Sequence, residues 1–81
     1  MIKAKIEELL EQAFKPTQLI VIDESHKHAG HAGALQGGHY QVIIVSKSFE
    51  GKKLLEIHRL IYQALDPVKK SIHALAIKAS S

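Results

Sequence analysis

Histidine and glycine are concentrated in one stretch of the chain, from Ser25 to His39. Four of the six histidines lie there, together with four of the five glycines; the histidines are His26, His28, His31 and His39. Imidazole binds zinc, copper and iron, and glycine allows tight backbone turns with little side-chain bulk. The spacing of the first three histidines suits metal binding from a flexible loop. No acid is placed to complete a closed ligand set, so a polar, hydrogen-bonding loop is the alternative interpretation.

Two more histidines lie far along the chain. His58 falls on the apolar face of an expected helix, where a histidine more often belongs to the core and hydrogen-bonds a backbone carbonyl or a loop group. His73 lies early in an expected strand, where its side chain can reach the rim of the sheet, and a structural role and a ligand role are equally consistent with that position. The chain has no cysteine, so any thiolate ligand must come from a partner.

The second half of the chain is basic. Residues 51–81 hold six basic residues against two acids, whereas residues 1–50 hold five lysines against six acids. Such an excess could contact DNA or an acidic protein, and a solvated lysine-rich face is the alternative. The candidates for phosphate contact are Lys52, Lys53, Arg59, Lys69 and Lys70.

Signals for nucleic-acid binding or catalysis are otherwise weak. Gly30 to Gly33 matches the GxxG of KH domains, but it lies between two expected strands and has no basic residue at its centre. The four aromatic residues are spaced like core residues, so no stacking platform is predicted; they are Phe14, Tyr40, Phe49 and Tyr62. No Ser/His/acid order, P-loop or dinucleotide motif is present, so we do not expect an enzyme.

The elements that position these residues follow from the periodicity of the apolar residues. Apolar residues recur with helical spacing from Ile2 to Ala13, and Pro16 ends that helix. Strands are expected at 19–22 and 40–45, joined by the long histidine loop. Residues 46–51 should form a turn in which Ser48 caps the next segment and Phe49 enters the core.

A second helix is expected from 52 to 65, followed by a short turn and a strand over 72–78. The predicted apolar face of this helix comprises Leu54, Leu55, His58, Leu60, Ile61, Ala64 and Leu65. On the last strand, strict alternation predicts that His73, Leu75 and Ile77 share one face.

The resulting order is helix, strand, strand, helix, strand. It predicts a two-layer α+β domain, with a three-stranded mixed sheet that has both helices on one face. The chain is short enough to form a single domain over residues 1–81. It shows no signal peptide and no apolar run long enough to span a membrane, so a cytoplasmic location is expected.

Taken together, these pieces resemble the BolA family over about residues 2 to 79. The matching residues, in chain order, are Asp23-Glu24-Ser25 followed by His28, His39-Tyr40, Val45-Ser46, Phe49-Glu50-Gly51, His58-Arg59-Leu60-Ile61-Tyr62, and Ile72-His73-Ala74-Leu75-Ala76-Ile77. The loop sequence His28-Ala29-Gly30-His31-Ala32-Gly33 looks like that of a histidine-loop member.

The resemblance implies a KH-like fold (type II) without a functional GxxG. It also implies a monothiol glutaredoxin partner and a shared [2Fe-2S] cluster, held on one side by the glutaredoxin cysteine and glutathione and on the other by BolA histidines. The family's His-Ala-Leu histidine falls on His73, the loop ligand falls on His28 or His31, and His39 is a further candidate. A chain of this kind would be monomeric alone, without a tightly bound cluster, and heterodimeric with its partner.

BolA proteins are also described as transcriptional regulators, which makes DNA binding the alternative function. The family commonly has Arg-His-Arg in its second helix, whereas this chain has Ile57-His58-Arg59. Because the first arginine is missing, the DNA or partner contacts that the family makes through this helix are less well supported for this chain.

Overall fold

The computed structural model describes residues 2–25 and 38–81. The elements are α1 (Ile2–Phe14), β1 (Gln18–Asp23), β2 (Gly38–Val45), the 3-10 helix η3 (Lys47–Phe49), α2 (Leu54–Ala64), the 3-10 helix η4 (Asp66–Ser71) and β3 (Ile72–Ser80). The predicted loop histidines His26, His28 and His31, and the GxxG segment, lie outside the described residues.

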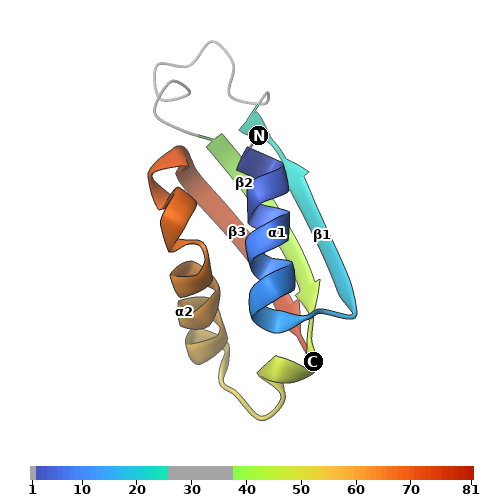
Figure 1. Cartoon of the computed structure of the whole chain (residues 1–81). Coiled ribbons are helices and arrows are strands. Elements are labelled where there is room, and N and C mark those ends of the chain that lie inside the picture. The colour runs from blue at the N-terminus through green and yellow to red at the C-terminus, as the bar shows by residue number, and fades with distance from the viewer. Residues whose placement is uncertain (1, 26–37) are drawn as a thin grey trace.

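The three strands form one sheet in the order β1-β2-β3. β1 and β2 are antiparallel, with Gln18 opposite Val45 and Asp23 opposite Tyr40. β2 and β3 are parallel, because the chain crosses over through α2 and η4 between them. Figure 1 shows α1 and α2 on the same face of this sheet. The predicted two-layer α+β architecture with a mixed sheet is confirmed.

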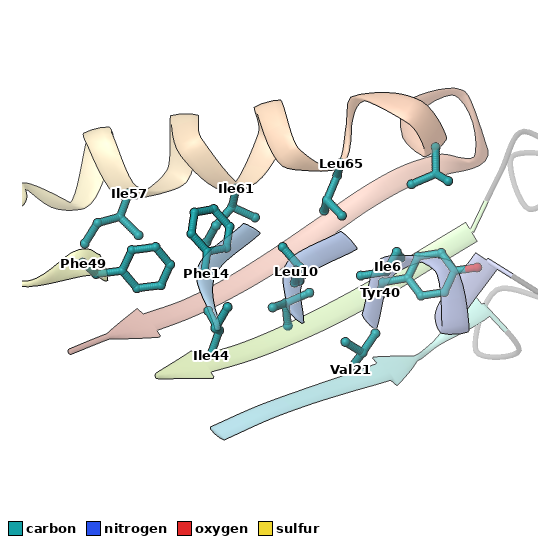
Figure 2. Packing of buried hydrophobic residues seen from close by; sticks show 12 residues of the cluster. Ile6, Leu10, Phe14, Val21, Tyr40, Ile44, Phe49, Ile57, Ile61 and Leu65 are labelled. Atoms are coloured by element: carbon teal, nitrogen blue, oxygen red, sulfur yellow. The ribbon is translucent and has the colours of Figure 1, made fainter. Parts of the chain in front are cut away.

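The core lies between the helices and the covered face of the sheet (Figure 2). From the helices, the buried cluster includes Ile6, Leu10 and Phe14 of α1 and Ile57 and Ile61 of α2. From β2 it includes the alternate residues Tyr40, Val42 and Ile44. Phe49 is buried, as predicted. The rings of Phe14 and Phe49 pack at a centroid distance of 5.0 Å. The apolar stripe of α1 therefore ends on Phe14, whereas Ala13 is exposed.

The predicted apolar face of α2 was too wide. Leu54 and Leu55, which belong to that predicted face, are 60% and 65% exposed, and Tyr62, which lies outside it, is 52% exposed. Leu55 and Tyr62 are seven positions apart and so share a helix flank. The opposite flank carries Leu60 and Ala64, which do pack against the core.

One buried serine joins the end of α1 to the end of β2. The hydroxyl of Ser46 donates a hydrogen bond to the carbonyl of Phe14 at 2.7 Å and accepts one from the backbone N–H of Ser48 at 3.1 Å. Ser46 therefore caps η3. The predicted cap by Ser48 of the next helix is wrong, because α2 begins after Lys53 and has no side-chain cap. Lys15, with φ of 45°, turns the chain out of α1 before Pro16.

Candidate metal-binding site

Two of the predicted ligands meet at one end of the sheet. His39 is the second residue of β2 and His73 the second residue of β3, and these strands are parallel neighbours. Parallel pairing places the beginnings of both strands at the same end of the sheet. The imidazole rings lie 5.0 Å apart between centroids and are tilted by 45°. His73 is exposed and His39 is partly buried, so the pair is open to solvent.

A bulge in the β2–β3 pairing makes this contact possible and corrects the face predicted for His73. Gly38 pairs with Ile72 but His39 pairs with Ala74, so β3 holds one extra residue. Ile72 and Leu75 both pack against the core, which strict alternation would forbid. His73 therefore does not share a face with Leu75 and Ile77, and its ring reaches His39 instead.

Hydrogen bonds from the backbone of His39 to the two residues after β1 fix its position. Its N–H donates to the hydroxyl of Ser25 at 3.0 Å, and its carbonyl accepts from the N–H of Glu24 at 2.7 Å. The N–H of Ser25 in turn donates to a carboxylate oxygen of Asp23 at 2.9 Å. These contacts involve the Asp23-Glu24-Ser25 segment, which stood out in the sequence only through the family resemblance.

Gly38 allows Tyr40 to pack at the same end of the sheet. A Cβ at position 38 would lie 2.5 Å from the Tyr40 ring and 2.8 Å from the Ser25 hydroxyl. Burial, together with the nearby negative charge of Asp23, raises the pKa of the Tyr40 phenol, while a hydrogen bond with Ser25 partly opposes the shift. Glycine is required at position 38 because the Tyr40 ring of the same strand packs too close for any side chain to fit.

The described residues at this end form an incomplete donor set for a metal ion. Among the described residues, no group of three or more His, Asp or Glu side chains could hold a metal ion. Two adjacent imidazoles nevertheless fit one side of an iron or zinc site. The residues present therefore fit part of a metal centre, and its further ligands would have to come from elsewhere. His28 and His31 lie outside the described part.

The remaining histidine, His58, does not join this pair in the described structure. Its Nε2 is buried and has no hydrogen-bond partner. The predicted hydrogen bond to a carbonyl or loop group is therefore wrong for this atom. The helical pattern placed His58 at the border of the core correctly, but it could not show whether an acceptor lay within reach.

The predicted phosphate-contact residues are all exposed: Lys52, Lys53, Arg59, Lys69 and Lys70. Lys69 is 3.6 Å from the carboxylate of Asp66, in a surface ion pair. Tyr62, predicted to be in the core, is instead exposed on the same helix as Arg59.

In the described part of the chain, no helix is long and apolar enough to cross a membrane.

The fold and this site define a small α+β domain with a pair of histidines, one exposed and one partly buried, at one end of its sheet. Residues 10–81 match the family model described as BolA-like protein. The chain is 42% identical to the DNA-binding transcriptional regulator BolA of Escherichia coli, over 95% of this chain and 72% of that protein. It is 40% identical to Protein BOLA1, chloroplastic, of Arabidopsis thaliana, over 91% of this chain and 49% of that longer protein.

Solved structures agree with these relatives. The BolA domain of SufE1 from Arabidopsis thaliana superposes with a TM-score of 0.81 at 44% identity, over 96% of this chain and 88% of that one. The chain therefore belongs to the BolA-like protein family.

Proposed function

We propose that the chain is an adaptor, not an enzyme, that pairs with a monothiol glutaredoxin and co-ligates a [2Fe-2S] cluster through histidines. The observation that carries this proposal is the contact between the His39 and His73 rings. Two imidazoles on neighbouring strands can occupy one side of a metal centre. The chain has no cysteine, so the thiolates must come from elsewhere.

In this proposal His73 is the fixed ligand, because it is exposed on a strand of the sheet. His39, or His28 or His31 from the histidine loop, supplies the second imidazole. The hydrogen bonds of the Ser25 hydroxyl and the Glu24 N–H to the backbone of His39 hold β2 in place beside the pair. A cluster with neutral imidazole ligands would have a higher reduction potential than one held by thiolates alone.

The test is reconstitution of the chain with a monothiol glutaredoxin, iron, sulfide and glutathione. Visible absorbance and circular dichroism of the purified complex should change in His73→Ala. A change in His39→Ala would identify that residue as the second ligand; otherwise His28→Ala and His31→Ala decide between the loop histidines. His58→Leu is the matched control, because it removes a histidine outside the pair. Wild-type spectra in all four ligand variants would refute the proposal.

A second candidate function is DNA binding, favoured by the name of the Escherichia coli relative and by the exposed basic residues of α2 and η4. Contact with phosphates should make the affinity fall steeply as salt rises. Fluorescence anisotropy with promoter duplexes should then show weaker binding by Lys52→Ala and Lys53→Ala, with the salt slope reduced by about one for each phosphate that the variant no longer neutralises. Absence of binding at low salt would contradict this function.

A further inference from the structure

The third strand has a free edge. β3 is nine residues long and pairs with β2 on one side; no other strand of the described chain pairs with its outer side. The outer backbone groups of an edge strand can pair with another extended chain. Proteins commonly use such an edge to bind an extended peptide, with backbone hydrogen bonds for affinity and side-chain pockets for specificity.

An exposed apolar side chain of α2, Leu54, lies beside the end of β3. A hollow of about 360 Å³ is lined by Leu54, at the start of α2, and by residues of β2 and β3, including Ile77 and Ala79. Leu55 and Tyr62 are also exposed, and they lie on the flank of α2 opposite Leu60 and Ala64, which pack against the core. Figure 1 shows α1 on one side of α2 and no element on its other side.

The charges around this surface are mostly positive. Lys52, Lys53 and Arg59 are exposed on and before α2, and Lys78 is exposed on β3; Glu56 is the one acid of α2. A second copy of the chain would bring the same positive charges to the edge and be repelled. DNA would match the charge but would leave the hollow and the exposed leucines unfilled. An acidic, partly apolar polypeptide satisfies both features.

We propose that the outer edge of β3 and the adjoining flank of α2 form a docking groove for an extended segment of a partner protein in which acidic and apolar residues alternate. The segment adds a fourth strand beside β3, places apolar side chains against Leu54 and the hollow, and directs acids to Lys78 on the other face of the sheet. Successive side chains of a strand point to opposite faces, which matches this division.

This groove is separate from the histidine pair. The hollow lies where Val45 pairs with Ser80, whereas the histidines lie at the other end of the same strands. Seven residues of strand separate His73 from Ser80, or about 20 Å. The groove can therefore be occupied while the histidines bind a metal centre, and it does not depend on the proposed function.

Selection of a displayed random nonapeptide library on the intact chain tests the proposal. We expect enriched sequences in which Asp or Glu alternates with apolar residues. The most enriched peptide, titrated into the ¹⁵N-labelled chain, should shift the amide signals of Leu54 and of Ile77 to Ser80 and slow hydrogen exchange on the outer side of β3. Failure to enrich any sequence, enrichment of sequences without acids, or shifts confined to other surfaces would overturn it.

Charge reversal supplies the matched comparison. Lys78→Glu should weaken binding of the selected peptide about tenfold, whereas Lys3→Glu, an exposed change on α1, should leave it unchanged. Leu55→Ser should also weaken it, and His73→Ala should not. A concentration-dependent dimer abolished by Lys78→Glu, or displacement of the peptide by a DNA duplex at moderate salt, would assign the edge to a second copy or to DNA and refute the proposal.

Discussion

The ring of Tyr40 occupies the space that a side chain at Gly38 would need, with Cε2 only 2.5 Å from an ideal Cβ at that position. Both residues lie beside His39, whose backbone N–H is held by Ser25. A side chain at position 38 would therefore displace Tyr40 and Ser25, and with Ser25 the hydrogen bond that positions His39 in the histidine pair.

We expect Gly38→Ala to lower the free energy of unfolding by about 1–3 kcal/mol, because the Tyr40 ring and the Ser25 hydroxyl must both move. Urea unfolding measures the loss, and the NMR signals of the His39 and His73 rings should shift in the folded variant. Unchanged stability and unchanged ring signals would contradict the close packing of Gly38 against Tyr40.

Gly51→Ala is the control for this variant. Gly51 has φ of 76° and nothing within 4 Å of an added Cβ, so the substitution strains the backbone without a steric clash. We expect a loss of about 1 kcal/mol with no change in the histidine signals. The two variants together separate a conformational cost from a packing cost.

The sequence predicted the elements and their order because each helix and strand has a clear apolar period. It could not place His73 correctly, since the bulge opposite Gly38 and His39 depends on pairing between strands far apart in the chain. It also overestimated the buried face of α2. Leu54 and Leu55 continue the apolar pattern at the start of the helix, but the pattern does not indicate where the covering core ends.

The Tyr40 phenol should titrate above its ordinary pKa of 10.0, because burial and the charge of Asp23 disfavour the phenolate. A pKa that is higher in the folded state means that the stabilising contribution is complete below pH 10 and declines as pH rises through the folded pKa. In Tyr40→Phe, the free energy of unfolding should therefore depend less on pH above pH 10. An identical pH dependence in both proteins would contradict the raised pKa.

Loss of the Ser46 hydroxyl should separate the end of α1 from the end of β2. Ser46→Ala removes the partner of the Phe14 carbonyl in a buried place and that of the part-buried Ser48 N–H, so we expect a loss of about 1–3 kcal/mol in urea unfolding. Ser48→Ala is the matched control. Its hydroxyl lies 3.4 Å from the same carbonyl and the residue is exposed, so the change should cost less than about 0.5 kcal/mol. Equal losses of stability in Ser46→Ala and Ser48→Ala would contradict a stabilising role for the buried hydrogen bond of Ser46.

His58→Leu should keep or raise the free energy of unfolding, by up to about 1 kcal/mol. The buried Nε2 of His58 has no hydrogen-bond partner, so the folded state bears the cost of removing a polar atom from water. Leucine fills a similar volume without that cost, whereas His58→Ala should destabilise by leaving a cavity. Urea unfolding of the three proteins checks the order leucine, histidine, alanine. A clear loss of stability in His58→Leu would show that the imidazole makes a favourable polar contact in solution, and His58 would then be a structural hydrogen-bonding residue after all.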